Sequence, residues 1–247
     1  MLKSFFLSLG LLGCGLLAAA DLYMAGDSTM QTYREKAYPQ QGWGQRMQEL
    51  AGPGTKVHNL SIGGRSTKSF KAQGRWDKLL AQLKKGDFVI IQFGHNDGAR
   101  QKPERYAPPA EYGENLRQFV ADVRRAGGIP VLVTSIPFGN FKDGKVNPAR
   151  FLEAYLKSMR EVAAETKCDL IDLNRYAVEE FGKMGEEKVT ELYLVLKPGE
   201  YPNYPDGRKD RCHLSDKGAL FYAEAVVRLA GKQKLPIAGL FKAPPAE

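Results

Sequence analysis

Cysteine is scarce in this sequence, and several compositional extremes are missing. Three cysteines among 247 residues are too few for a small disulfide-stabilised fold. The 26 glycines and 14 prolines follow no period, which excludes collagen-like and low-complexity chains, and no repeat of solenoid length is present. The remaining composition, 43% hydrophobic and 26% charged, is typical of a globular protein. A chain of this length buries most of its apolar surface without disulfides or metals.

Several common site motifs are missing as well. The sequence has no CxxC, no HExxH, no P-loop and no GxGxxG after a predicted strand. It also lacks G-x-S-x-G, which excludes the usual nucleophile elbow. With three histidines and no Cys/His cluster, we expect no zinc site. The formal charge of +8 favours acidic partners without naming them.

The first twenty residues have the pattern of a secretory signal peptide. Lys3 gives a positive start, an apolar run follows over residues 5–17, and Ala18-Ala19-Ala20 supplies small residues for cleavage. The run is short for a transmembrane helix, and a buried N-terminal helix is the structural alternative. We therefore expect a signal peptide at 1–20 and one domain at 21–247.

Cys14 offers a second interpretation of the same segment, because Leu11-Leu12-Gly13 before it resembles a lipoprotein cleavage site. Leu16 and Leu17 continue the apolar run beyond Cys14, which favours cleavage after Ala20 instead. Either route exports the protein, to the periplasm or out of the cell. After cleavage at Ala20 we expect no stable membrane insertion.

Short apolar runs alternate with helical patterns along the rest of the chain. Continuous rather than alternating apolar runs favour strands that are covered on both faces. The predicted strands are 22–25, 57–62, 88–93, 129–136 and 169–173. The predicted helices are 44–50, 75–83, 109–126, 148–166 and 215–230, the last capped by Ser215. This succession predicts a three-layer α/β domain with parallel strands.

The two cysteines after the signal segment lie far apart in this arrangement. Cys168 opens a predicted strand, whereas Cys212 falls in a predicted loop near the end of the chain. In a parallel sheet they would lie at opposite ends, beyond the Cα separation of about 7 Å that a disulfide permits. We expect two free thiols.

Polar clusters follow the first three predicted strands. They read Gly26-Asp27-Ser28-Thr29, Gly63-Gly64-Arg65-Ser66 and Gly94-His95-Asn96-Asp97. Because parallel strands place their functional loops at one edge of the sheet, the clusters indicate a single site. Ser28 can expose its hydroxyl and its own amide, paired glycines let backbone amides approach a ligand, and Asn96 carries an amide donor suited to an oxyanion. Taken alone, each cluster also fits an ordinary turn, and Ser28 fits a helix N-cap.

A serine nucleophile needs a base, and three histidines are available. His58 lies in or beside the second strand, which favours a structural role. His95 has no evident orienting carboxylate except Asp97. His213 stands three residues after Asp210, so one segment can supply both the base and the carboxylate that fixes its tautomer.

These clusters together resemble the blocks of the SGNH, or GDSL-like, hydrolase superfamily. The blocks are Gly26-Asp27-Ser28, a glycine after the second strand, Gly94-His95-Asn96-Asp97 and Asp210-x-x-His213. Further segments bring the likeness closer to the rhamnogalacturonan acetylesterases, and to their bacterial branch: Gly42-Trp43-Gly44, Gly64-Arg65-Ser66 and the stretch 198–207. The resemblance extends over residues 21–231.

The resemblance implies a fold and a set of roles. The fold is a flavodoxin-like α/β/α sandwich with a five-stranded parallel sheet. Ser28 would be the nucleophile, His213 the base and Asp210 its orienter, with an oxyanion hole formed by the Ser28 and Gly64 amides and the Asn96 side chain. Gly64 fits better than Gly63 because Arg65-Ser66 follows it directly. The family requires no metal and no organic cofactor.

The implied activity is that of a secreted carbohydrate esterase which removes acetyl groups from an acidic polysaccharide, above all rhamnogalacturonan. Arg65 and Trp43 are candidate substrate contacts, and nucleic acid is not an expected partner. Lys68, Lys71 and Arg75 near Arg65 would favour a polyanion, although such charges equally form a solvated helix face. A xylan acetylesterase, a lipase or thioesterase, and a non-catalytic carbohydrate-binding protein are the alternatives on the same fold.

Overall fold

The computed structural model describes residues 20–147 and 149–242, and a parallel sheet lies at its centre. Five strands run in the order β2-β1-β3-β4-β7, and every neighbouring pair is parallel. Their bounds are Leu22–Gly26 (β1), Val57–Asn59 (β2), Phe88–Gln92 (β3), Ile129–Val133 (β4) and Asp169–Ile171 (β7). The predicted five-stranded parallel sheet is confirmed.

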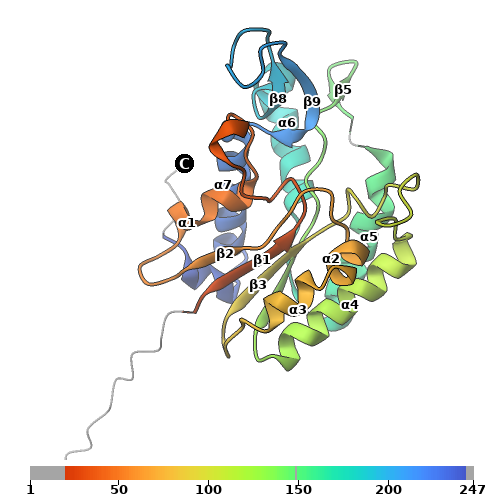
Figure 1. Cartoon of the computed structure of the whole chain (residues 1–247), viewed down its shortest axis with the longest axis vertical. Coiled ribbons are helices and arrows are strands. Elements are labelled where there is room, and N and C mark those ends of the chain that lie inside the picture. The colour runs from red at the N-terminus through yellow and green to blue at the C-terminus, as the bar shows by residue number, and fades with distance from the viewer. Residues whose placement is uncertain (1–19, 148, 243–247) are drawn as a thin grey trace, which may run out of the picture.

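Helices cover both faces of this sheet and form the outer two layers (Figure 1). One face carries α2 (Thr67–Ala72), α3 (Arg75–Leu80), α4 (Pro109–Arg125) and α5 (Glu153–Thr166). The other carries α1 (Met47–Leu50), α6 (Leu173–Thr190) and α7 (Asp216–Lys232). The Ser215 side chain caps α7 by accepting a hydrogen bond from the Gly218 amide, as predicted.

Each central strand contributes to two separate hydrophobic cores. Leu22 and Met24 of β1 pack beneath α6 and α7, whereas Tyr23 and Ala25 pack beneath α2 to α5. A strand that is buried on both faces needs apolar residues at every position, which explains the continuous runs in the sequence.

The sheet order places a crevice where the site was predicted. The connection after β1 runs to β2 on one side, and the connection after β3 runs to β4 on the other side, so these two connections leave in opposite directions. The carboxyl ends of β1 and β3 therefore form the switch point at which open α/β sheets bind ligands. The segments after Gly26 and Gln92 meet there.

The main departure from the predicted elements is a hairpin outside the sheet. Strands β8 (Tyr193–Leu196) and β9 (Arg208–Leu214) pair antiparallel and lie beyond the end of the sheet, near β5 (Phe141–Lys142) and its partner β6 (Lys145–Val146) (Figure 1). Cys212 and His213 thus lie in a strand, not in the predicted loop. The sequence of β9 is mostly polar because its residues are exposed or half-buried, so it lacks the apolar signal of a central strand.

Helices α2 and α6 also lie outside the predicted elements. In α6, Gly182 and Gly185 weaken the helical pattern, and Gly185 adopts φ 78°, which interrupts the helix. The short α2 contains too few turns for a clear periodicity.

The predictions for the N-terminal segment fall outside the described residues. These are the signal peptide at 1–20, of which only Ala20 is described, and the lipoprotein alternative at Cys14. Across residues 20–147 and 149–242, no helix is both long enough and apolar enough to cross a membrane. Cys168 and Cys212 are not paired with each other, in agreement with the prediction of free thiols, and burial raises the pKa of Cys168 to about 11.

Candidate active site

Ser28, His213 and Asp210 form one hydrogen-bonded row at the carboxyl edge of the sheet. The Ser28 hydroxyl lies 3.0 Å from His213 Nε2, and His213 Nδ1 lies 2.8 Å from Asp210 Oδ2. A carboxylate only accepts hydrogen bonds, so Nδ1 carries the proton and Nε2 is left to accept from Ser28. Residues 185 positions apart in the sequence are thus brought together, as the sequence predicted.

The turn after β1 presents Ser28 toward His213. The Met30 amide donates to the Asp27 carbonyl, and the Thr29 amide and hydroxyl both donate to Asp27 Oδ1. The Tyr33 hydroxyl donates to the Ser28 carbonyl at 2.9 Å. Ser28 therefore lies in a turn held by its neighbours and does not cap a helix.

A local turn in β9 holds the Asp210 carboxylate. Its Oδ1 accepts hydrogen bonds from the amides of Cys212 and His213, and its Oδ2 accepts from His213 and from Arg208 Nη2 at 3.2 Å. Burial alone would raise the pKa of Asp210, but the hydrogen bonds and charge of His213, with the Cys212 amide, hold it well below its usual range. Asp210 is therefore ionised at neutral pH and can stabilise an imidazolium.

Free hydrogen-bond donors gather on the other side of Ser28. The Gly63 amide donates to Gln31 Oε1, whereas the amides of Ser28 and Gly64 have no protein acceptor among the described residues. A Cβ built on Gly63 would lie 3.4 Å from Ser28 Cβ, so this loop borders the hydroxyl. The Gly63 amide is thus already engaged and the Gly64 amide is not, and the assignment of Gly64 as an oxyanion donor stays a prediction.

The Asn96 side chain is oriented by an arginine that also borders Gly64. Arg105 Nη1 donates to Asn96 Oδ1 at 3.2 Å. Because a guanidinium has donors only, it fixes the oxygen of the amide and leaves Nδ2 as a donor elsewhere. Arg105 also borders Gly64: φ there is +77°, and a Cβ would lie 3.2 Å from Nη1. Arg105 and Gln31 were not identified from the sequence, since no motif marks either.

The structure corrects one proposed substrate contact. Trp43 has no exposed surface, and its Nε1 donates to Gln92 Oε1 within the core. A side chain buried in this way cannot stack on a sugar, so the assignment of Trp43 to the substrate is wrong. Trp43 instead supports Gln92, whose Oε1 lies 3.2 Å from the Thr29 hydroxyl beside the serine.

The two remaining histidines lie away from the serine hydroxyl. His58 pairs with Asp21 at 2.9 Å, which fits its predicted structural role. The carboxylate beside His95 Nδ1 is Asp27, at 3.5 Å, and not Asp97 as expected from the sequence. The Asp97 carboxylate accepts instead from the amide and hydroxyl of Thr67, which orders the start of α2.

The basic residues after the second strand are partly engaged in holding loops. Arg65 donates to the Gly63 carbonyl at 2.6 Å and to Gln73, and Lys68 donates to the carbonyls of Pro103 and Tyr106. Burial, with the nearby charges of Arg75 and Arg105, lowers the pKa of Arg65. Arg65 therefore lies beside the oxyanion loop, where its role as a substrate contact stays a prediction.

The arrangement has the parts for acyl transfer through a serine. The Ser28 hydroxyl is hydrogen-bonded to an imidazole whose other nitrogen is fixed by an ionised carboxylate. The Gly63–Gly64 loop, in which the Gly64 amide has no acceptor among the described residues, borders the same serine. Within the described residues, no group of three or more His, Cys, Asp or Glu side chains is placed to hold a metal ion.

Comparison with known proteins agrees with this architecture. Residues 24–221 match the model of the GDSL-like lipase/acylhydrolase family. The rhamnogalacturonan acetylesterase RhgT of Bacillus subtilis is 35% identical over 218 residues, which are 88% of this chain and 92% of the relative. YesY, a probable rhamnogalacturonan acetylesterase of the same species, is 34% identical over 220 residues, which are 89% of this chain and 96% of the relative.

Solved structures show the same fold. A Bacillus subtilis protein superimposes with a TM-score of 0.74 at 27% identity over 88% of this chain, which spans 57% of that protein. A variant of an acetyl-xylooligosaccharide esterase from Geobacillus superimposes with a TM-score of 0.64 at 25% identity, over 87% of this chain and 95% of that one.

The sheet and the family match together define an enzyme of the carboxylic ester hydrolase class. More particularly, the chain belongs to the GDSL-like lipase/acylhydrolase family.

Proposed function

We propose that this protein is a carbohydrate acetylesterase that removes acetyl groups from rhamnogalacturonan. The observation that carries the proposal is the row of Ser28, His213 and Asp210, with free donors on the other side of the serine. The relatives named as rhamnogalacturonan acetylesterases support the substrate. The chain covers more than nine-tenths of each of these two relatives, so the comparison concerns their whole length.

In the first half of the reaction, Ser28 Oγ attacks the carbonyl carbon of the acetyl ester. His213 Nε2 takes the hydroxyl proton, and Asp210 stabilises the resulting imidazolium. The tetrahedral intermediate collapses with cleavage of the bond to the sugar oxygen, which receives the proton from His213. The sugar leaves and the acetyl group remains on Ser28.

In the second half, water attacks the acetyl carbon and gives a proton to His213. The bond to Ser28 Oγ breaks, His213 returns the proton to the serine, and acetic acid leaves and releases its remaining proton to the solvent as acetate forms. In both halves the carbonyl oxygen becomes negative, and the Ser28 amide, the Gly64 amide and Asn96 Nδ2 are the donors that face it. Because these donors need no reorganisation, they stabilise the transition state more than the ester.

The experiment that tests the proposal is acetate release from acetylated rhamnogalacturonan, acetylated xylan and acetylated mannan. We expect the highest kcat/KM on rhamnogalacturonan and no release by the Ser28→Ala variant. Release confined to long-chain acyl esters would instead identify a lipase. Binding of polysaccharide without any release would identify a non-catalytic carbohydrate-binding protein.

Acetylated xylan is the second candidate substrate, because an acetyl-xylooligosaccharide esterase shares the fold over 87% of this chain. The formal charge of +8 favours the acidic polymer. Exposed charges are screened beyond about 8 Å at 0.15 M salt, so activity on rhamnogalacturonan should fall with salt while activity on neutral xylan hardly changes. Equal rates on rhamnogalacturonan and xylan, with equal responses to salt, would indicate a general polysaccharide acetylesterase.

We also propose that the protein is exported through the segment 1–20. N-terminal sequencing of the protein recovered from the native host's periplasm and medium tests this. A mature chain that begins at Asp21 supports cleavage after Ala20, whereas a lipid-modified Cys14 at the N-terminus would support the lipoprotein route.

A further inference from the structure

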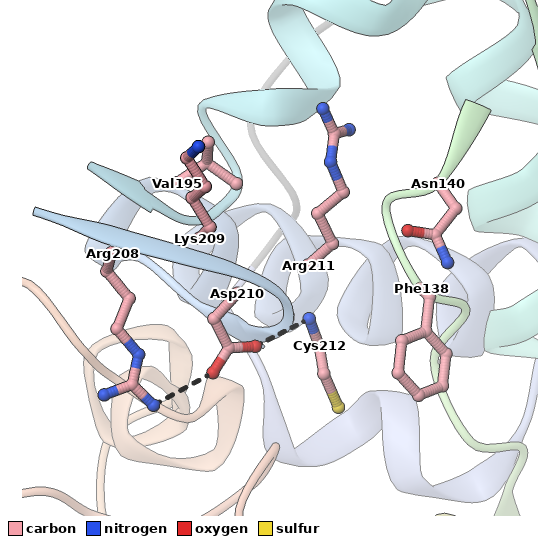
Figure 2. Close-up of a pocket in the computed structure, with 8 residues that line it drawn as sticks. All are labelled: Phe138, Asn140, Val195, Arg208, Lys209, Asp210, Arg211 and Cys212. Carbon is pink, nitrogen blue, oxygen red and sulfur yellow. Dashed lines mark hydrogen bonds and ion pairs between the residues drawn. The ribbon is translucent and has the colours of Figure 1, made fainter. Parts of the chain in front are cut away.

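Two hollows lie near the catalytic row. The first, which we call the Lys209 hollow, has a volume of about 610 Å³ and is lined by Phe138, Asn140, Val195, Lys209 and Asp210, among others (Figure 2). It adjoins the row because Asp210 forms part of its wall. Volumes of this size suit ligands larger than an acetyl group.

The second, the Arg100 hollow, has a volume of about 640 Å³. His95, Gly98, Arg100, Phe151 and Tyr155 line it. It adjoins the turn that carries Ser28 through His95, whose Nδ1 lies 3.5 Å from the carboxylate of Asp27. Two hollows that a small acyl group does not need therefore lie near the reacting ester.

An aromatic pair connects the two hollows. Phe138 of the first and Phe151 of the second meet edge to face, with ring centroids 5.9 Å apart, and Phe138 also meets the His95 ring at 5.4 Å. Phe151 is 46% exposed. Only one other large hydrophobic side chain, Tyr38, is classed as exposed in the described part of the chain. An exposed phenyl ring between two hollows loses hydrophobic free energy unless a ligand covers it.

The charges of the hollows are positive and only partly neutralised. Arg208 pairs with Asp210, and Arg211 pairs with Glu186. Lys209 and Arg100 have no ion-pair partner among residues 20–147 and 149–242. Each hollow therefore offers one cation to a ligand.

We infer that the two hollows and the Phe138–Phe151 pair between them bind the sugar residues on either side of the acetylated one, and that Lys209 and Arg100 select uronate carboxylates. This inference rests on the proposed function and adds the site that would distinguish an acidic chain from a neutral one. The apolar face of a sugar ring covers Phe151, and neighbouring carboxylates reach the two cations. Fixing the chain on both sides positions a single ester at Ser28.

Equilibrium binding of de-esterified rhamnogalacturonan oligosaccharides tests the inference without any catalysis. Phe151→Ala should raise the Kd about tenfold, as loss of one good ring contact does, and Phe151→Trp should restore it. Lys209→Gln and Arg100→Gln should each raise the Kd about two- to fivefold at low salt and flatten its salt dependence. Lys78→Gln in α3 removes the same charge from an exposed position elsewhere and should leave the Kd unchanged.

Kinetics provide the second measurement. In the Phe151→Ala variant, the ratio of kcat/KM on an acetylated oligosaccharide to kcat/KM on 4-nitrophenyl acetate should fall about tenfold. An unchanged ratio, or a Kd no different from that of the Lys78→Gln control, overturns the inference even if rhamnogalacturonan is the substrate. Wild-type protein that hydrolyses the aryl acetate but neither binds nor deacetylates rhamnogalacturonan overturns the proposed function itself.

Discussion

The two sides of Ser28 are built in opposite ways. On the side of β9, the polar groups are bonded to one another: Asp210 receives two amides, His213 and Arg208, and His213 reaches the serine. On the other side, the Gly64 amide and Asn96 Nδ2 have no acceptor among the described residues, while Gln31 holds the neighbouring Gly63 amide and Arg105 holds Asn96 Oδ1. We call these the proton side and the oxyanion side.

The difference follows from what each side must do. A proton moves back and forth along the proton side, so its groups must already be hydrogen-bonded in the resting enzyme. Negative charge appears on the oxyanion side only during the reaction, so its donors must stay unoccupied until then. Supporting residues such as Arg105 keep these donors in place without accepting hydrogen bonds from them.

The largest effect should come from replacing Ser28 or His213 on the proton side. Ser28→Ala should lower kcat roughly 10⁴-fold or more, and His213→Ala should do nearly as much damage because the row acts as a unit. Acetate release measures the activity of each variant, and circular dichroism checks that the variant is folded.

His95→Ala is the matched control for the histidine. It should be milder, because His95 faces Asp27 and the Ile136 carbonyl rather than the serine. If His95→Ala proves more damaging than His213→Ala in a folded protein, the base has been assigned to the wrong residue.

The next effect should come from the oxyanion side. Asn96→Ala should lower kcat about a hundredfold with little change in KM, because Nδ2 would donate only to the charged intermediate. Steady-state kinetics on an aryl acetate and on the polysaccharide check this. A change confined to KM would mean that Asn96 binds the substrate instead.

A smaller effect should show that Arg105 acts through Asn96. Arg105→Met removes the donor to Asn96 Oδ1 while keeping an apolar stem, and it should lower kcat about three- to tenfold, the value of one hydrogen bond. In an Asn96→Ala background the same change should have no further effect. Arg105→Lys should recover part of the rate, whereas additive losses would show that the two residues act independently.

The sequence was sufficient to predict the residues of the proton side. It was not sufficient to predict Arg105 and Gln31, which support the oxyanion side. Asp210 and His213 are close in sequence, and Ser28 follows a strong apolar run, so spacing and topology bring them together. Arg105 acts from an irregular segment between β3 and α4, where no periodicity indicates which way a side chain points. Trp43 was assigned to the substrate because it lies in a family segment, but a motif does not reveal burial.

The same contrast holds for the fold. Central strands are readable because both of their faces are buried, which demands continuous apolar residues. Strand β9 pairs with one other strand, and all of its residues except Leu214 are exposed or half-buried, so it lacks the apolar run that marks a central strand. The types and spacing of Asp210 and His213 therefore identified these residues in the sequence, but no pattern predicted the hairpin that carries them.

One carboxyl group from each side provides the subtlest test, because their pKa values move in opposite directions. The pKa of Asp210 is held below its usual range, whereas burial raises the pKa of Asp97, next to Asn96, to about 7 in spite of its hydrogen bonds from Thr67. Above its unfolded pKa, near 4, Asp210 therefore contributes stability that is lost as the pH falls. Asp97 binds a proton in the folded state that the unfolded chain has released, so its contribution declines as the pH rises from about 4 to about 7.

Thermal unfolding of Asp97→Asn and Asp210→Asn between pH 3 and pH 8 separates the two contributions. Asparagine imitates a neutral carboxyl group and keeps an oxygen for Thr67, so the stability of Asp97→Asn relative to wild type should rise between about pH 4 and pH 7 and level off above. Asp210→Asn should show a constant deficit over that window, and the deficit should shrink only as the pH drops below about 4. A flat difference for Asp97→Asn across pH 4–7 would mean that Asp97 is already ionised in the fold. Asp97 and Asp210 would then both be ionised in the fold, and this difference between the two sides would disappear.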